Sequence, residues 1–153
     1  MPAGRHPFVA TPADAPALAS HSRAAFGPAE ALSAGTFRQR MTRGSAVVVG
    51  LRDEVGAIIA YLMLYRHRRT RRAYINESFV HPSRRGEGLA SILMAAAELE
   101  ARAAGMATLA AHVRVSNLPS LRAKLRQGLA VVARLPGWYP GPEDALYLKK
   151  ILV

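Results

Sequence analysis

Two arginines and two glycines occupy a short turn, Arg84-Arg85-Gly86-Glu87-Gly88, between an apolar stretch and an alanine-rich one. A strand, a glycine-containing turn and a helix in that order leave unpaired N–H groups at the positive end of the helix dipole, which favours an anion. Glycine lets the main chain approach a ligand closely because it has no Cβ. Guanidinium groups add charge that matches the geometry of phosphate oxygens. The turn therefore predicts a site for a ligand that carries phosphate.

The spacing narrows the kind of ligand. The turn lacks the Gly-Lys-Ser/Thr of a Walker loop and the Gly-x-Gly-x-x-Gly of a dinucleotide site. Residues 85–90 read Arg-Gly-Glu-Gly-Leu-Ala and fit the pattern Arg/Gln-x-x-Gly-x-Gly/Ala. This pattern resembles the acetyl-CoA pyrophosphate loop of the GNAT superfamily of N-acetyltransferases. Because an ordinary helix-starting turn can also hold these residues, the rest of the chain has to decide.

The composition indicates what kind of protein positions this turn. Half of the 153 residues are hydrophobic, and no linker or internal repeat divides the chain, so we expect one domain spanning residues 1–153. No run approaches the roughly 18 apolar residues of a membrane span, and the first residues lack the apolar core of a signal peptide. Without cysteine there is no disulfide framework and no thiol nucleophile. We expect a cytoplasmic protein without a membrane partner, either a monomer or a homodimer.

The net charge is +11, and five of the arginines crowd one short segment together with a histidine. Nucleic-acid binding is the first interpretation of such a cluster. However, the segment lies between two apolar stretches, which is typical of a solvated hairpin tip, and no recognition helix or aromatic stacking face accompanies it. Nucleic acid is therefore disfavoured as a partner, and an acidic partner or the CoA phosphates explain the charge equally well. The residues concerned are Arg66, His67, Arg68, Arg69, Arg71 and Arg72.

Local patterns predict the elements around the turn. In chain order they are a strand at 8–10, helices at 11–26 and 29–43, strands at 46–51, 56–65 and 74–80, a helix at 89–104, a strand at 106–115, a helix at 118–127, and strands at 129–135 and 145–152. The order β-α-α-β-β-β-α-β-α-β-β resembles the GNAT fold. It implies an α/β protein with a mixed central sheet of about seven strands and four helices.

Two later stretches extend the resemblance over nearly the whole chain. Residues 113–117, Val-Arg-Val-Ser-Asn, precede a helix and Gln-Gly-Leu, and resemble the x-x-Asn…Leu-Gly-Phe landmark of the family. Residues 137–140, Gly-Trp-Tyr-Pro, followed by Glu-Asp-Ala-Leu at 143–146, resemble the tail of the ribosomal-protein-alanine type of N-terminal acetyltransferase.

The resemblance implies a set of residues around acetyl-CoA. The backbone of Phe79 and Val80 would face the acetyl group and pantetheine, between the splayed strands 74–80 and 106–115. Asn117 would contact the pantetheine arm, although a helix-capping role explains it as well. No metal is expected. The pyrophosphate would be held by Arg85, Gly86, Glu87, Gly88, Leu89, Ala90 and Ser91.

Acetyl transfer to an amine needs a neutral amine held near the thioester, a donor to the oxyanion and a thiolate that can leave. In the ribosomal-alanine type a Glu immediately before Val-Arg-x-Ser-Asn acts as general base, and His112 stands in that place. Some eukaryotic N-terminal acetyltransferases carry a His there, working with a strand tyrosine; Tyr74 is a possible counterpart, offset by about one residue. Histidine, with a pKa of about 6.5, can accept a proton near neutrality. The alternative is a strand histidine without a catalytic role.

Four further residues complete the candidate site. Glu77 is the only acid in its strand, and alternation places it on the same face as Phe79, where it could act as a base or pair with a nearby arginine. Lys124 takes the place of a tyrosine that protonates the thiolate in many family members; it could donate a proton, stabilise the thiolate, bind a CoA phosphate or face solvent. Trp138 and Tyr139 would form the floor of the acceptor site, or a surface aromatic pair on a loop.

These residues together predict an acetyl-CoA-dependent N-acetyltransferase that transfers acetyl directly. A protein N-terminus is the first candidate acceptor, a lysine the second and a small-molecule amine the third. At pH 7 an α-amine with a pKa near 8 costs only about 1.4 kcal/mol to deprotonate, against roughly 4.6 kcal/mol for lysine. The alternative is a non-catalytic acyl-CoA- or nucleic-acid-binding domain with the same fold.

Overall fold

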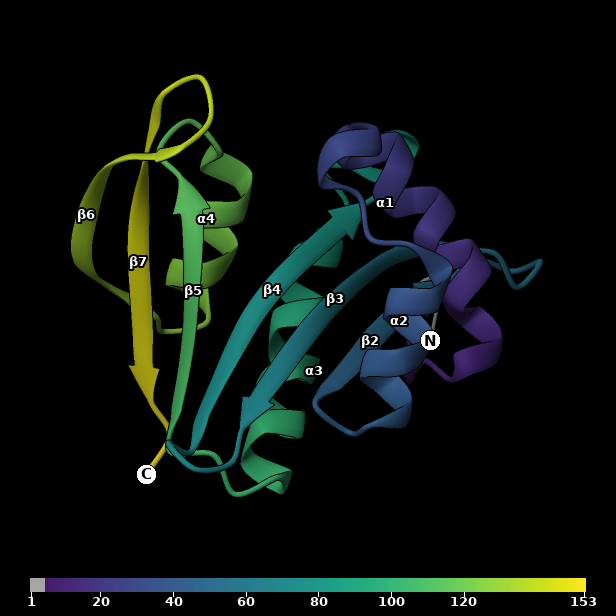
Figure 1. Ribbon diagram of the computed structural model, residues 1–153, viewed down its shortest axis with the longest axis horizontal. Helices are drawn as coiled ribbons and strands as arrows, with labels where there is room; N and C mark the ends of the chain where they lie inside the picture. The colour runs from purple at the N-terminus through teal and green to yellow at the C-terminus, as the bar shows by residue number, and fades with distance from the viewer. Residues whose placement is uncertain (1–4) are drawn as a thin grey trace.

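The computed structural model describes residues 5–153, which form a seven-stranded sheet with helices on both faces (Figure 1). The strand order is β1-β2-β3-β4-β5-β7-β6, and the sheet is mixed because β4 and β5 run parallel while the other neighbours are antiparallel. The predicted fold class and element order are confirmed. The elements are β1 (Phe8–Val9), α1 (Ala15–Glu30), α2 (Ala34–Thr42), β2 (Ala46–Arg52), β3 (Ile58–His67), β4 (Arg72–Val80), α3 (Leu89–Ala103), β5 (Thr108–Arg114), α4 (Leu118–Arg126), β6 (Ala130–Tyr139) and β7 (Glu143–Ile151), with short 3₁₀ turns at Pro12–Asp14 and Pro82–Arg84.

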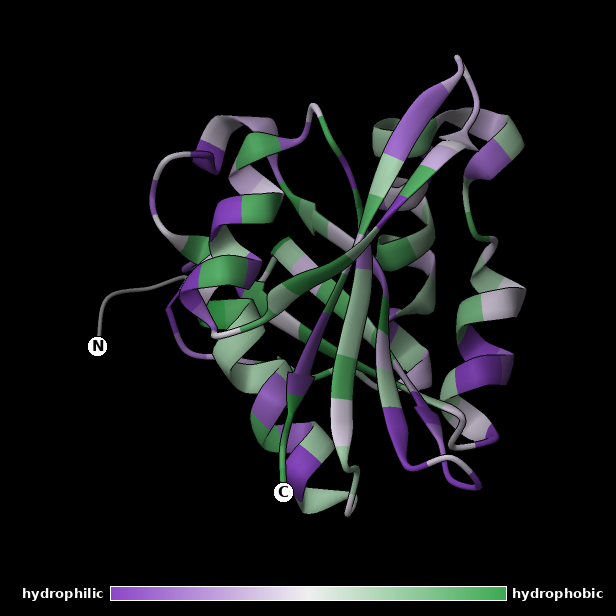
Figure 2. Ribbon diagram, turned by 90° about the vertical axis from the view of Figure 1, so that its left-hand side faces the viewer, coloured by the Kyte–Doolittle hydropathy of each residue, from purple (hydrophilic) through white to green (hydrophobic). Residues whose placement is uncertain are grey.

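The helices bury apolar faces on opposite sides of the sheet. Leu89, Leu93 and Ala97 recur on one side of α3 at helical spacing and pack in a core with β2 to β5. On the other side, Leu18 of α1 and Phe37 of α2 pack in a second core. Strands β2 and β3, which are covered on both faces, are buried along most of their length, whereas β6 is mostly exposed. Figure 2 shows the hydropathy of each residue along the strands. Within residues 5–153, no helix is both long and apolar enough to cross a membrane.

A β-bulge in β4 decides which of its side chains share a face. Met63 of β3 pairs with Glu77, whereas the next residue, Leu64, pairs with Ile75, so Asn76 is the extra residue. The bulge shifts the alternation by one position. As a result Tyr74 and Glu77, which strict alternation would place on opposite faces, both face the side covered by α1 and α2.

The strands β4 and β5 are paired over only part of their length and then diverge. Their parallel pairing runs from Arg72 with Thr108 to Ile75 with Ala111 and stops there, although both strands continue. Figure 1 shows the two strands diverging toward the upper end, where α3 and α4 begin. The residues beyond the divergence, including Phe79, Val80 and His112, therefore make no pair between β4 and β5.

Some predicted boundaries are wrong. The second helix begins at Ala34 rather than at residue 29, because Gly27 kinks α1, Ala31 is extended and Ser33 caps α2 by accepting a hydrogen bond from the N–H of Thr36 (3.1 Å). The strands β3 and β4 each reach further into the arginine segment than predicted, so the hairpin tip contains only residues 68–71.

Candidate active site

The turn before α3 has the main-chain geometry of an anion site. Gly86 and Gly88 have left-handed φ angles of 83° and 78°, and a Cβ added to either would meet nothing within 4 Å. The first main-chain hydrogen bond of α3 runs from Ile92 N–H to the carbonyl of Gly88 (3.4 Å). The N–H groups of Leu89, Ala90 and Ser91 lie in the first turn of α3, where they have no partner within the helix and are available to a ligand. This open, amide-lined turn fits a pyrophosphate.

The two arginines of the turn differ. Arg84 holds Glu87 through two hydrogen bonds of 2.7 and 3.0 Å, and this contact lowers the pKa of the Glu87 carboxyl. The positive charge that Arg84 is expected to add to the turn is therefore paired with Glu87. Arg85 is exposed and makes no ion pair within the described residues, so its guanidinium group can meet an anion. Sequence reasoning missed Arg126, in the last turn of α4, whose Nε donates to Ser91 Oγ (3.4 Å).

Helix α4 carries two of the predicted residues. Asn117 caps the helix, and its Oδ1 accepts a hydrogen bond from the N–H of Ser120 (3.3 Å), so the capping role is confirmed. Lys124 is only 4% exposed, which rules out the solvent-facing alternative. Its Nζ donates to Ser120 Oγ (2.7 Å), and burial lowers its pKa to about 8. A buried ammonium with no carboxylate partner in residues 5–153 is suited to meeting a negative charge.

Tyr74 and His112 are brought together across the end of the β4–β5 pairing. The Tyr74 hydroxyl lies 2.5 Å from His112 Nδ1. Burial lowers the pKa of His112, so the imidazole is neutral at pH 7, and burial together with Tyr139 and Tyr147 raises the pKa of Tyr74 to about 12. The pair thus joins a protonated phenol to a neutral imidazole.

Trp138 and Tyr139 have separate roles. Both belong to strand β6 rather than to a loop, and Trp138 stacks on the His112 ring with a centroid distance of 4.8 Å and an interplanar angle of 3°. Tyr139 instead lies under the guanidinium of Arg114 (4.3 Å). Trp138 therefore covers the imidazole of His112, while Tyr139 of β6 contacts Arg114 at the end of β5.

Glu143, which sequence reasoning did not single out, connects the start of β7 to the segment before α4. Its carboxylate accepts hydrogen bonds from the N–H (3.0 Å) and the hydroxyl of Ser116 and pairs with Arg114 (3.3 Å). The Glu-Asp-Ala stretch of the sequence was the signal for it.

Glu77 lies against a second tyrosine. The Tyr61 hydroxyl donates to Glu77 Oε1, and Tyr61 is fully buried between Phe37 (5.9 Å) and Phe79 (5.5 Å). Burial and the charge of Glu77 raise the pKa of Tyr61. Within residues 5–153 Glu77 makes no ion pair, so the predicted arginine partner is wrong. The face that Glu77 shares with Phe79 is as predicted.

Two histidines missed by sequence reasoning lie beside Phe79. His21 of α1 stacks on the Phe79 ring at 4.7 Å, and burial lowers its pKa. His81, directly after β4, lies edge-on to Phe79 at 6.3 Å, and its Nδ1 accepts from the N–H of Ser83 (3.1 Å). Nothing in the local sequence links His21 to β4, because the two segments lie far apart along the chain.

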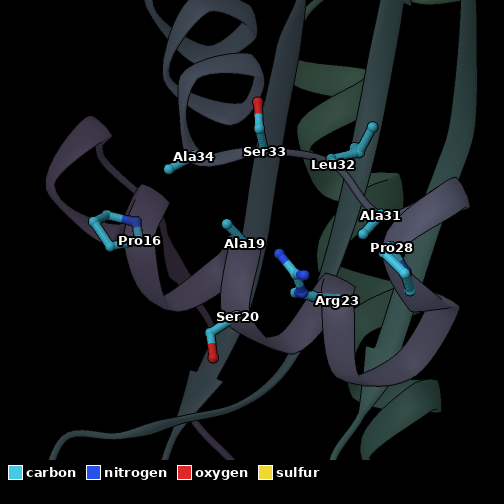
Figure 3. A pocket seen from close by; sticks show the side chains of 9 residues that line it. All are labelled: Pro16, Ala19, Ser20, Arg23, Pro28, Ala31, Leu32, Ser33 and Ala34. Carbon is cyan, nitrogen blue, oxygen red and sulfur yellow. The ribbon is translucent and has the colours of Figure 1, made fainter.

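A hollow between α1 and α2 holds different side chains (Figure 3). It is lined by small apolar residues, Ser20, Ser33 and a single charged side chain, Arg23. None of its lining residues is an acid or a histidine, so it offers no group for acyl transfer. Within residues 5–153 no cluster of three or more His, Cys, Asp or Glu is arranged to hold a metal ion.

Comparisons with known proteins add to this geometry. Residues 16–129 match the family model described as the acetyltransferase (GNAT) family. A comparison with curated proteins found no match. Similar solved structures include the ribosomal-protein-alanine N-acetyltransferase from Brucella melitensis, at 22% identity, with 96% of this chain and 99% of that chain covered and a TM-score of 0.84.

Two further solved structures are similar. The structure of yncA from Salmonella typhimurium with its cofactor acetyl-CoA has 20% identity, covers 97% of this chain and 94% of that chain, and gives a TM-score of 0.81. Nourseothricin acetyltransferase has 18% identity, 97% and 98% coverage, and a TM-score of 0.74. At these identities the likeness shows a shared fold.

Proposed function

The chain belongs to the acetyltransferase (GNAT) family, and from this premise we propose that it transfers acetyl from acetyl-CoA directly to a primary amine, first of all the N-terminal α-amine of a peptide or protein. We also propose that residues 1–153 form a single domain and act in the cytoplasm. The observation that carries the activity is the Tyr74–His112 pair at the point where β4 and β5 diverge.

Acetyl-CoA would be held by the open turn and the diverging strands. The N–H groups of residues 86–91 and the Arg85 guanidinium match the charge of a pyrophosphate. The main chain of Phe79 and Val80 lies on one side of the divergence and Asn117 on the other. When bound, acetyl-CoA supplies an activated thioester.

His112 would receive the proton of the attacking amine. The amine nitrogen attacks the thioester carbonyl carbon, the C–S bond breaks, and the amine gives one proton to the imidazole. Burial lowers the pKa of His112 and so keeps it unprotonated before the step, while Tyr74 fixes the ring through Nδ1. An α-amine needs only about 1.4 kcal/mol to lose its proton at pH 7, so a weak base suffices.

Lys124 would act on the leaving group. With a pKa of about 8 it carries a proton at pH 7, and it is buried in α4, where its Nζ donates to Ser120 Oγ. We infer that it stabilises the CoA thiolate or gives it a proton, so that the products are an amide and free CoA. Glu77 is the competing base, held in place by Tyr61.

The acceptor is tested with matched peptides that differ only in which amine is free. One peptide has a free N-terminus and no lysine, and the other has a blocked N-terminus and one lysine. Because the chain has no cysteine, a thiol reagent reports only the CoA released. We expect faster release with the free N-terminus. Faster release with the lysine peptide would reassign the acceptor, and no release on any peptide or small amine would support the non-catalytic alternative.

The cofactor assignment has its own test. Acetyl-CoA should raise the Tm of the wild type through linkage, and Gly88→Val should abolish that rise because it places a side chain where the phosphates would sit and strains a left-handed residue. A retained rise in Tm would show that the nucleotide is held elsewhere.

A further inference from the structure

Arginines from two segments far apart in the sequence meet at one end of the sheet. Arg66 of β3 donates from Nη2 to the carbonyl of Gly44 (2.7 Å), just after α2, and its N–H donates to the carbonyl of Ser45 (2.9 Å). Arg40 of α2 lies over the ring of Tyr65 at 5.2 Å. The last turn of α2 and the β3–β4 hairpin are therefore one continuous surface.

This surface is basic and unneutralised. No acidic residue occurs in segments 31–52 or 55–76. Apart from Arg71, whose guanidinium is hydrogen-bonded to the main chain, four of its arginines are exposed and make no ion pair within the described residues. We call these four the arginine surface: Arg43, Arg68, Arg69 and Arg72.

The hairpin that carries most of the arginine surface is anchored. Arg71, with a φ of 53°, donates from Nε to the carbonyl of Gly105 (3.0 Å), and its own carbonyl accepts from the N–H of Ala107 (2.7 Å). The main chain that carries the neighbouring arginines is thus anchored, which reduces the backbone entropy lost when they bind a partner.

The arginine surface is remote from the candidate active site. Arg72 begins β4 and Val80 ends it, so the two ends are about 25 Å apart at the usual rise per residue of a strand. Figure 1 shows the hairpin at the lower end of the sheet and the divergence of β4 and β5 at the upper end. The CoA phosphates, which the sequence alone left as an explanation, therefore cannot account for this charge.

We propose that the arginine surface binds the phosphate backbone of a nucleic acid without reading its sequence. Guanidinium groups match phosphate oxygens bidentately, and all the cations here are arginine rather than lysine. The lack of a recognition helix argues against base readout and leaves phosphate contacts unaffected. A lipid surface fits less well, because segments 36–45 and 65–72 carry no exposed large hydrophobic side chain to insert.

The test is fluorescence anisotropy with a labelled oligo(U) RNA, titrated at several salt concentrations. Four arginines that each neutralise one phosphate predict a slope of about −3 for log K against log salt, at roughly 0.7 per contact on a single strand. Arg68→Ser/Arg69→Ser should make the slope shallower by about 1.4. The double variant should keep the acetyl-CoA-induced rise in Tm and the turnover of an uncharged peptide, which shows that it is folded.

The matched control is Arg23→Ser/Arg122→Ser, which removes the same charge from exposed positions elsewhere and should leave the slope unchanged. An equal weakening by the control would show that net charge alone drives binding and would overturn the proposal. So would absence of RNA binding at low salt. A polyglutamate peptide that binds more tightly than the RNA, and is lost in the hairpin variant, would replace nucleic acid with an acidic protein partner.

Discussion

Two tyrosine-based pairs lie on the same face of the sheet, on either side of the β4 bulge, and their surroundings differ. His112 of the first pair is partly exposed beyond the last β4–β5 contact, under a Trp138 ring that is itself 55% exposed. Tyr61 of the second pair is fully buried. A tyrosine hydroxyl thus meets a candidate base twice, in the first pair from the partly buried Tyr74 and in the second from the fully buried Tyr61. We infer that the first pair moves a proton and the second fixes a carboxylate.

The largest expected effect distinguishes the two candidate bases, His112 and Glu77. His112→Ala should lower kcat by roughly 10²–10⁴-fold, the usual worth of general acid–base catalysis, while acetyl-CoA still raises the Tm. Glu77→Gln is the matched variant and should change kcat by less than about tenfold, since it only loses charge beside the reacting groups. Steady-state kinetics on one peptide checks both. The reverse ranking would make Glu77 the base and invert the comparison.

Lys124 belongs to neither pair. Replacing it tests whether a separate residue acts on the CoA thiolate as it leaves. Its pKa is lowered from 10.5 to about 8, so between those pH values the unfolded chain binds more protons and stability rises with pH. Below pH 8 the burial of the charge costs about 3 kcal/mol. Lys124→Met should therefore raise the free energy of unfolding at pH 7 by up to that amount and flatten its rise above pH 8, while kcat falls. Denaturant titrations at pH 7 and pH 9.5 measure this, and an unstabilised variant at pH 7 would mean that the ammonium is solvated.

Removing the hydroxyl of each tyrosine should affect a different property, stability for Tyr61 and kcat for Tyr74. Tyr61→Phe leaves the partly buried Glu77 carboxylate without its hydroxyl donor and should cost about 1–3 kcal/mol of stability, with little change in kcat. Tyr74→Phe should leave stability nearly unchanged and lower kcat, because the His112 ring loses its anchor. Chemical denaturation and turnover of the two variants side by side provide the measurement. A Tyr61→Phe protein that is stable but inactive would move the catalytic centre to the second pair.

The smallest effect concerns the pH profile of the first pair. The rate should rise with pH through an apparent pKa below about 6.5, since burial lowers the pKa of His112. Trp138→Ala exposes the ring and should move this limb upward by less than about one pH unit. The limb should persist in Glu77→Gln and vanish in His112→Ala. If the apparent pKa of this limb is the same in Trp138→Ala as in the wild type, the limb does not report the titration of His112.

Much of the fold could be predicted because its signals are local. Strand and helix periodicities gave the element order, and Gly86 and Gly88 marked the turn before α3, since left-handed residues there favour glycine whatever lies around them. Asn117 was recognisable as a cap for the same reason. These features depend on neighbours within a few positions of the chain.

The partners of the candidate catalytic groups depended on the tertiary structure. Alternation along β4 cannot reveal the bulge at Asn76, because register is a property of two paired strands, and without it Tyr74 and Glu77 would not share a face. The burial of Lys124 and the pairing of Arg84 with Glu87 likewise depend on packing and side-chain direction.

The arginine surface is a second case in which contacts between distant segments could not be predicted from the sequence. Its hairpin was visible as a charged run, but the contribution of α2 was not, because Arg66 and Gly44 are separated along the chain and meet only when β2 and β3 pair. Residue types and local spacing therefore determined which groups this protein can use. The pairing of distant strands determined which of those groups act together.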